Sequence, residues 1–182
     1  MGITEEEKGV LLLAARESIG SLFNQSSGSK INYQQYPFLK NHFGAFVTLR
    51  IDGELRGCIG YVLSQKTLLE TVCEAAKQSA FSDPRFLPLT EEEFEKVKIE
   101  ISILSSPKKI KDYDEVEVGT HGLIIDEGYI HAVLLPQVAI ANNFSREQFI
   151  SALCEKGGLP PDIWKIQKLN LQIFSAQIIS EK

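Results

Sequence analysis

Apolar and polar positions at the start of the chain repeat with the spacing of a helix. Apolar residues recur every three to four positions from Val10 to Phe23, as on a helix with one buried face. Thr4 and Glu7 precede this run, and a threonine followed three residues later by a glutamate is typical of a capping box. The pattern predicts a helix from Thr4 to about Phe23.

Two largely apolar segments, 44–51 and 54–63, flank the dipeptide Asp52-Gly53. Asp-Gly accommodates the positive φ angles of a type I′ turn, so the pattern predicts a β-hairpin with a two-residue loop. Such a turn fixes a register. The expected facing pairs are Ile51 with Glu54, Leu49 with Arg56, Val47 with Cys58, and Phe46 with Ile59. Both faces carry apolar residues, so we expect this sheet to be covered on both sides.

A second helix is expected after this hairpin. Ser64 is a residue type preferred at a helix N-cap, and Leu63 with Leu68 has the spacing of a hydrophobic staple. Apolar residues continue at helical spacing to Ala80. We therefore place this helix from Ser64 to about Ala80.

The loop over 81–89 contains two prolines and leads into another helix start. Thr90 and Glu93 form a second capping-box pattern, which predicts a short helix. The alternation of polar and apolar residues in Lys98–Leu104 then predicts a half-buried strand.

The rest of the chain repeats these signals. Ser145 and Gln148 form a third capping-box pattern, and Trp164 is expected to anchor a loop on the core. A loop within the fold is expected over 25–30. The further elements expected are a hairpin of Leu123–Ile125 and Tyr129–Leu135, a short helix from about Gln137, a helix from Ser145 to about Gly157, and a strand over 169–179.

The order of these elements favours the α+β class with mixed or antiparallel sheets. Hairpins dominate, and no two strands are joined only by a crossover helix, which argues against a doubly wound fold. The segments IDGELRGCIGYVLS and IDEGYIHAVLLPQ share the order strand, turn, strand and helix start, which is consistent with a duplicated hairpin-helix unit. No linker divides the sequence, so 1–182 is expected to form one domain with two intertwined lobes.

Composition narrows the classes of protein. The net charge of -5 opposes binding to nucleic acid by phosphate neutralisation. Cys58, Cys73 and Cys154 are odd in number and far apart, so neither a disulfide framework nor a thiolate zinc site is expected, and a reducing cytoplasm fits best. No secretory signal, membrane span or metal-ligand motif is recognised, so we expect a cytoplasmic protein with no catalytic metal.

The hexapeptide LRGCIG, Leu55 to Gly60, is the main candidate for chemistry. Glycine inside a strand weakens it unless a bulge or a close approach needs the space. In one interpretation Gly57 and Gly60 make room for a ligand, Arg56 binds its carboxylate or phosphate, and Cys58 is a thiolate favoured by that cation. In the alternative, Cys58 is a small buried side chain and the glycines accommodate a packed helix. On the first interpretation, changing either glycine to alanine costs at most about 2 kcal/mol but abolishes binding.

Two further regions have functional and structural interpretations. The loop bearing Asp83, Arg85 and Phe86 either brings a carboxylate and a guanidinium to the ligand or closes on itself through the Asp83 side chain. His121 is either a base for Cys58 or a turn histidine bonded to the backbone.

Six segments in order resemble the AMMECR family: LRGCIG, AFSDPRFLPLT, EISIL, GTHGLII, LLPQVA and KGGLPPDIW. The resemblance covers nearly the whole chain and implies an α+β fold in two lobes, with LRGCIG facing a cleft. It also implies that Leu55, Arg56, Gly57, Cys58, Ile59 and Gly60 form the family signature. The genomic context that it implies includes a Memo-type protein and a radical SAM protein, whereas it implies no particular reaction.

Two functions remain open. The first is a small enzyme or enzyme component that binds an anionic small molecule or modified group at LRGCIG and the 83–86 loop, with Cys58 as nucleophile and with no cofactor specified. The second is a non-catalytic adaptor for a Memo-like or radical SAM partner.

Overall fold

The computed structural model describes residues 2–25 and 32–181, and its chain divides into two compact units. The first unit comprises Met1–Leu104 with Gln177–Lys182, and the second comprises Ser105–Ala176. Each combines helices with antiparallel strands, which confirms the predicted α+β class. The loop predicted over 25–30 lies, apart from Gln25, outside the described residues.

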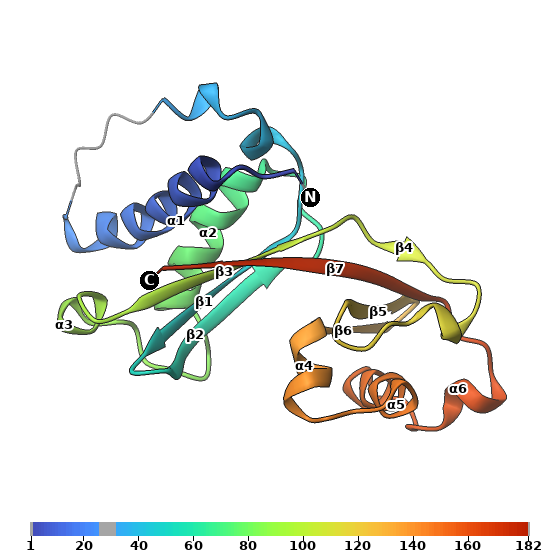
Figure 1. Cartoon of the computed structure of the whole chain (residues 1–182). Coiled ribbons are helices and arrows are strands. Elements are labelled where there is room, and N and C mark those ends of the chain that lie inside the picture. The colour runs from blue at the N-terminus through green and yellow to red at the C-terminus, as the bar shows by residue number, and fades with distance from the viewer. Residues whose placement is uncertain (1, 26–31, 182) are drawn as a thin grey trace. The chain divides into compact units, whose positions relative to one another are not determined.

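The first unit consists of a sheet with helices on one face (Figure 1). Its strands follow the order β2-β1-β3, and the end of β7 (Leu171–Ser180) lies next to β3. Helices α1 and α2 pack against each other and against the sheet. The elements are α1 (Glu5–Gly20), β1 (Ala45–Ile51), β2 (Glu54–Tyr61), α2 (Leu68–Phe81), α3 (Glu91–Phe94) and β3 (Lys98–Leu104), with 3-10 turns at Ser21–Phe23, Tyr33–Gln35 and Pro37–Lys40.

The core of this unit lies between the two helices and the sheet. Apolar side chains from α1, α2, β1 and β3 form one buried cluster. Its fully buried members include Leu11, Leu49, Leu68, Val72, Ile99 and Ile101. Removing this apolar surface from water contributes about 25 cal/mol per Å², so the cluster is the main source of stability of the unit.

The capping boxes predicted at Thr4, Thr90 and Ser145 are confirmed. In each, the hydroxyl accepts the backbone N–H three residues on, and the Glu or Gln at that position accepts the N–H of the cap residue. Helix α1 ends at Gly20, and a 3-10 turn continues to Phe23.

The predicted start of the second helix is wrong, because α2 begins after Thr67 rather than after Ser64. Thr67 and Glu70 form a capping box that satisfies two backbone donors, whereas the residue three after Ser64 is a threonine. Leu63 is largely exposed and contributes no staple. Ser64 instead accepts the N–H of Lys66 at 3.1 Å.

The first hairpin is confirmed, but its predicted register is wrong beyond Leu55. Asp52 and Gly53 have φ angles of 52° and 87°, as a type I′ turn requires. The ladder then shifts, and Arg56 is an extra residue in β2, which makes a β-bulge. The pairs on either side of the shift are Arg50 with Leu55 and Leu49 with Gly57.

This bulge changes which side chains share a face. Cys58 faces Thr48 rather than Val47, and Ile59 faces Val47 rather than Phe46. Because cross-strand partners lie on one face of a sheet, Ile59 shares the face of buried Val47, which packs with α2. Cys58 and Thr48 therefore lie on the opposite face.

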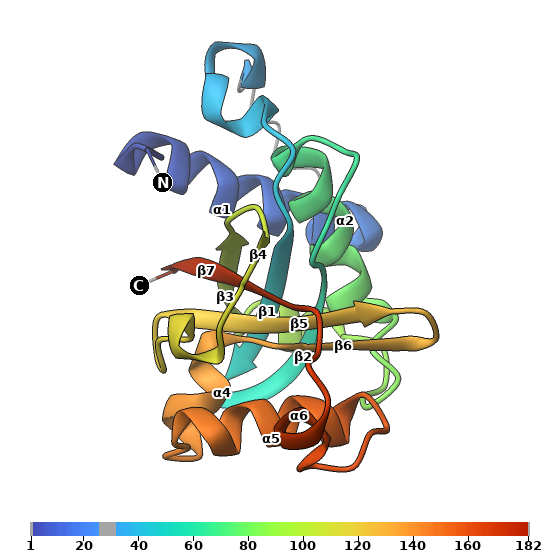
Figure 2. The same cartoon turned by 90° about the vertical axis from the view of Figure 1, so that its right-hand side faces the viewer.

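The second unit also combines strands and helices. Strand β5 pairs with β6 and with β7, and β4 also pairs with β7. Helices α4 and α5 lie on one side of the β5-β6 hairpin (Figure 2). The elements are β4 (Lys108–Lys109), β5 (His121–Glu127), β6 (Ile130–Leu134), α4 (Pro136–Ala141), α5 (Arg146–Lys156), α6 (Ile163–Ile166) and β7 (Leu171–Ser180), with a 3-10 turn at Tyr113–Glu115.

A separate apolar cluster fills the second unit. Phe149 and Leu153 of α5 are fully buried against Leu123 and Ile125 of β5. Trp164 packs on this cluster, as predicted, although it lies in the short helix α6 rather than in a loop. Within residues 2–25 and 32–181, no helix has the length and apolar character that a bilayer crossing requires.

Candidate functional site

Arg56 leaves the sheet at the bulge and holds the loop that follows α2. Its Nε and Nη2 donate to the two carboxylate oxygens of Glu93, each at 2.9 Å. Nη2 also donates to the carbonyl oxygen of Leu87 at 2.9 Å. The guanidinium fork that the sequence assigned to a ligand thus binds a carboxylate of the protein itself. Nη1 is buried and has no acceptor among the described residues.

Asp83 is the second anchor of this loop. Its side chain is 2% exposed. The carboxylate accepts hydrogen bonds from Nε of Arg85 at 3.0 Å and from Nη2 of Arg85 at 2.7 Å. It also accepts the backbone N–H of Arg85 at 3.1 Å, as the structural interpretation predicted for a loop closed by its own aspartate. The same carboxylate reaches β2, where it accepts the N–H of Cys58 at 2.8 Å.

Asp83 and Arg85 together cover the edge of β2 at Cys58. Strand β2 is at the end of the sheet order, and Nη2 of Arg85 donates to the Cys58 carbonyl oxygen at 3.3 Å. Unpaired N–H and C=O groups on an edge strand invite pairing with another chain. The two side chains satisfy both groups of Cys58 and so block strand addition at this residue.

Both anchoring carboxylates are favoured in their charged form. The Arg85 guanidinium holds the pKa of Asp83 well below its usual range, against the opposing effect of burial, and the N–H of Cys58 adds to the lowering. Arg56 lowers the pKa of Glu93 to about 2, with a further contribution from the N–H of Thr90. The loop is therefore held by two ion pairs at neutral pH.

Phe86 is in contact with both guanidinium groups. The Arg56 guanidinium carbon is 5.7 Å from the ring centroid, and that of Arg85 is 5.5 Å from it. Cation–π contacts of this kind favour a fixed ring position. The loop therefore presents its other side chains from a fixed backbone, and Leu87 is 83% exposed.

Neither glycine of the strand has room for a Cβ atom. A Cβ on Gly57 would lie 2.1 Å from the carbonyl oxygen of Ser79 in α2. A Cβ on Gly60 would lie 2.4 Å from the carbonyl oxygen of Ala45 and 2.5 Å from Cα of Phe46. The expectation that these glycines open space for a ligand is therefore wrong, and the alternative of close helix packing holds for Gly57.

Ser79 is a residue that the sequence analysis missed. Its hydroxyl accepts the N–H of Ile59 at 2.8 Å and donates to the carbonyl oxygen of Val47 at 2.8 Å, so it bridges β1 and β2 from the helix. Glu93, predicted only as a capping residue, was missed as the partner of Arg56. A serine on the apolar stripe of α2 was the available signal for Ser79, and no signal connected Glu93 to Arg56.

The Cys58 side chain is half-buried and accepts a hydrogen bond from the Thr48 hydroxyl at 3.4 Å. Burial raises the pKa of Cys73 and of Cys154. The cation next to Cys58 is Arg85. The pKa of Arg85 is raised mainly by its hydrogen bond to Asp83, and interaction with Cys58 adds to the rise.

His121 begins β5 in the second unit. Its Nδ1 accepts the N–H of Glu117 at 3.1 Å, which places the ring proton on Nε2. The histidine thus has the backbone bond of a turn residue, and its role as a base for Cys58 stays a prediction. Within the described residues, no group of three or more His, Cys, Asp or Glu is placed to hold a metal ion.

These features define a small α+β protein in which an arginine-glycine-cysteine edge strand is clamped by an aspartate-arginine loop. The chain matches the family model described as AMMECR1 over residues 12–179, and it belongs to this family. The resemblance inferred from the six sequence segments is therefore confirmed.

The relatives span nearly the whole chain. Protein MK0488 of Methanopyrus kandleri is 39% identical over 191 residues, with 99% of this chain and 91% of MK0488 covered. Protein MJ0810 of Methanocaldococcus jannaschii is 39% identical over 177 residues, with 92% and 88% covered. The crystal structure of the uncharacterized protein PH0010 from Pyrococcus horikoshii is similar with a TM-score of 0.87 and 33% identity, covering 100% of this chain and 95% of PH0010.

Proposed function

We propose that the protein binds an anionic small molecule or modified group at Arg85 and that Cys58 is the nucleophile presented to it. The observation that carries this proposal is the pairing of one guanidinium with the backbone of the half-buried cysteine. Arg56 then has a positioning role, because its fork is bound to Glu93 and fixes the loop on which Arg85 stands.

Arg85 has donors left for a ligand. Its Nε and Nη2 bind Asp83 and the Cys58 carbonyl, while Nη1 has no acceptor among the described residues. The side chain is 53% exposed. A guanidinium fixed on one side and open on the other suits a carboxylate or phosphate, since charge-assisted hydrogen bonds are the stronger ones.

The three cysteines offer an internal test of the nucleophile. We expect iodoacetamide to modify Cys58 at least about fivefold faster than Cys73 and Cys154, whose raised pKa values and burial disfavour the reactive thiolate. Peptide mass spectrometry of partially alkylated native protein gives the three rates. Faster modification of Cys73 than of Cys58 would remove the nucleophile role.

The anion site is tested by the charge of the reagent. Iodoacetate carries a carboxylate that neutral iodoacetamide lacks, so the ratio of their rates at Cys58 reports the nearby cation. We expect this ratio to be roughly threefold to tenfold higher in native protein than in urea-unfolded protein, and to fall with added salt. Equal ratios in both states contradict the anion site. Arg50→Met is the control variant: it removes a different arginine, leaves the Cys58 contacts in place and should keep the wild-type ratio.

A second function is favoured by the exposure of Leu87. An apolar side chain that is 83% exposed on a loop held by two ion pairs is available to a protein partner. We propose as the alternative that this loop docks the Memo-like or radical SAM protein implied by the family's genomic context, without chemistry at Cys58.

Substitution of two exposed leucines, Leu87 and Leu63, distinguishes this adaptor function from the function with Cys58 as nucleophile. Leu63 is also largely exposed but lies on a different loop, before α2. The adaptor function predicts that Leu87→Asp loses capture of the purified Memo-like or radical SAM protein, whereas Leu63→Asp and Cys58→Ser retain it. Equal capture by both leucine variants contradicts docking at the loop.

A further inference from the structure

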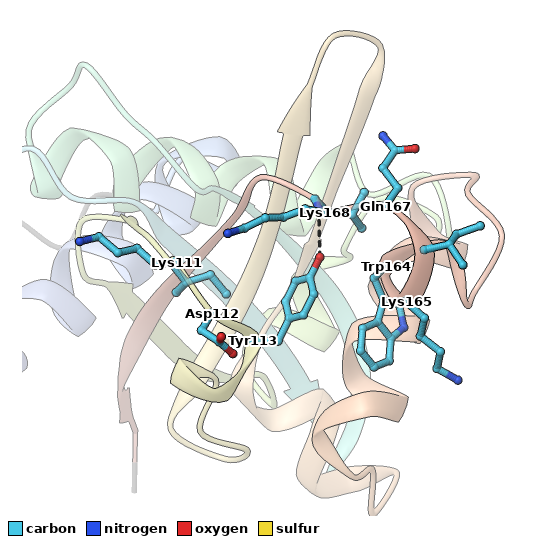
Figure 3. Close-up of a pocket in the computed structure, with 10 residues that line it drawn as sticks. Lys111, Asp112, Tyr113, Trp164, Lys165, Gln167 and Lys168 are labelled. Atoms are coloured by element: carbon cyan, nitrogen blue, oxygen red, sulfur yellow. Dashed lines mark hydrogen bonds between the residues drawn. The ribbon is translucent and has the colours of Figure 1, made fainter.

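A pocket in the second unit lies among residues to which the sequence analysis assigned no ligand. It has a volume of about 310 Å³ and lies between the segments 110–113 and 164–169. Figure 3 shows Tyr113 and Trp164 at its centre, with lysines around them. The pocket includes neither Cys58 nor Arg85, so binding at this pocket is independent of the function proposed for those two residues.

The aromatic walls of this pocket are fixed by their own polar atoms. Nε1 of Trp164 donates to the Ser151 hydroxyl at 3.0 Å. The Tyr113 hydroxyl accepts the N–H of Leu169 at 2.9 Å. The two rings meet edge to face, with centroids 5.4 Å apart and planes at 83°. Each ring is therefore oriented before any ligand arrives, and ring surface is what they offer to it.

The charges around these rings are mostly positive. The lining contains three lysines and one aspartate, in a chain with a net charge of -5. Lys165 is already paired with Asp162 at 2.6 Å. The one lining carboxylate, Asp112, accepts the N–H of Asp114 as the cap of a 3-10 turn.

Two ammonium groups remain. Within the described part of the chain, the ammonium groups of Lys111 and Lys168 make no hydrogen bond or ion pair. In the view of Figure 3 both extend to one side of the Tyr113 ring, whereas Lys165 extends beside Trp164 on the other side. Two ammonium groups on one side of the ring make that side of the pocket electropositive, which favours an anion there.

We propose that this pocket binds a small aromatic anion, a planar ring that carries a phosphate or a carboxylate. The ring packs on the Tyr113 and Trp164 surfaces, and the anionic group lies near Lys111 and Lys168. The volume is at the lower end of that of ligand pockets, which limits the ligand to about the size of a mononucleotide.

Trp164 provides a direct readout, because it is the only tryptophan in the chain. The indole N–H therefore gives a single signal in a ¹H–¹⁵N spectrum of the full-length protein. Two pairs of probes differ mainly in the anion: AMP with adenosine, and nicotinate with nicotinamide. We expect AMP, nicotinate or both to shift this signal in a saturable way below about 5 mM, and the neutral partner to bind at least about fivefold more weakly.

Three variants assign the charges. Lys111→Met and Lys168→Met are each expected to weaken binding of the anionic probe roughly threefold to fivefold, and added salt is expected to do the same. Lys77→Met removes an exposed lysine of the first unit and is expected to leave binding unchanged. An unchanged melting temperature verifies that each variant is folded.

The proposal fails on either of two results. If neither AMP nor nicotinate up to about 5 mM shifts the Trp164 indole signal in a saturable way, the pocket binds no aromatic anion. Equal binding of each anion and its neutral partner, unaffected by Lys111→Met and Lys168→Met, shows that the lysines recognise nothing. A shift with AMP alone assigns the site to phosphates, and a shift with nicotinate alone assigns it to carboxylates.

Discussion

Gly57→Ala tests whether α2 is packed against the backbone of β2. The new methyl carbon would lie 2.1 Å from the Ser79 carbonyl oxygen, well short of the 3.4 Å at which ordinary contact begins. The obstacle is helix backbone rather than the end of a flexible side chain, so α2 has to move. Overpacking of this kind costs about 1 to 3 kcal/mol.

Moving α2 also disturbs the Ser79 hydroxyl. Its hydrogen bonds to Ile59 and Val47, both 2.8 Å long, bridge the two strands, and each contributes about 1 kcal/mol. We therefore expect Gly57→Ala to lower the free energy of unfolding by about 3 to 5 kcal/mol. This exceeds the limit of about 2 kcal/mol expected from the sequence pattern alone.

Urea unfolding followed by far-ultraviolet circular dichroism measures this loss. Gly9→Ala is the matched control, because a Cβ at Gly9 in α1 has no neighbour within 4 Å. Replacing a helix-interior glycine by alanine is expected to stabilise by about 0.5 to 1 kcal/mol, the opposite sign. A loss below about 1 kcal/mol for Gly57→Ala would refute the packing argument.

Three further predictions concern the same framework. Because Arg56 lowers the pKa of Glu93 from 4.5 to about 2, the stability from this pair is present above pH 4.5 and is lost as the pH falls toward 2. The urea midpoint of the wild type should therefore fall more steeply than that of Glu93→Gln over this range, and parallel curves would contradict the pair. Thr67→Ala should lose about 1 kcal/mol in urea unfolding, and a loss below about 0.3 kcal/mol would argue against Thr67 as the cap of α2. Gly122→Ala places a Cβ 2.3 Å from the Phe174 ring and should lower the urea midpoint measured by Trp164 fluorescence, whereas an unchanged midpoint would show that the ring moves freely.

Signals that act within a few residues were read correctly from the sequence. The turn at Asp52-Gly53 and the capping boxes at Thr4, Thr90 and Ser145 depend on neighbouring residues only, so their patterns identify them. The start of α2 shows the limit of one signal taken alone. Ser64 has a suitable side chain, but Thr67 also has its glutamate three residues on.

The candidate site depended on partners far apart in the chain. Arg56 meets Glu93 across 37 positions, and this contact accompanies the bulge that shifts the register of β2. Asp83 and Arg85 were identified as candidates, but their contact with the Cys58 backbone needs the loop to return to the strand edge. Residue spacing does not encode such a return, so sequence reasoning assigned to Arg56 the contact with Cys58 that Arg85 makes.

The first unit is built from two segments that are far apart in the chain, and this affects the order of events during translation. Arg16 donates to the Glu181 carboxylate at 2.5 Å and 2.7 Å, and the N–H of Ile99 donates to the same carboxylate at 2.9 Å. Arg16 and Glu181 are 165 positions apart in the chain. At a translation rate of about 5 to 20 residues per second, Glu181 is synthesised roughly 8 to 33 s after Arg16. The second unit, Ser105–Ala176, is a continuous segment and leaves the ribosome before Glu181 does. A nascent chain therefore holds the Arg16 guanidinium without its carboxylate until translation has passed the whole second unit, and a chain that stops at Ala176 keeps that defect permanently.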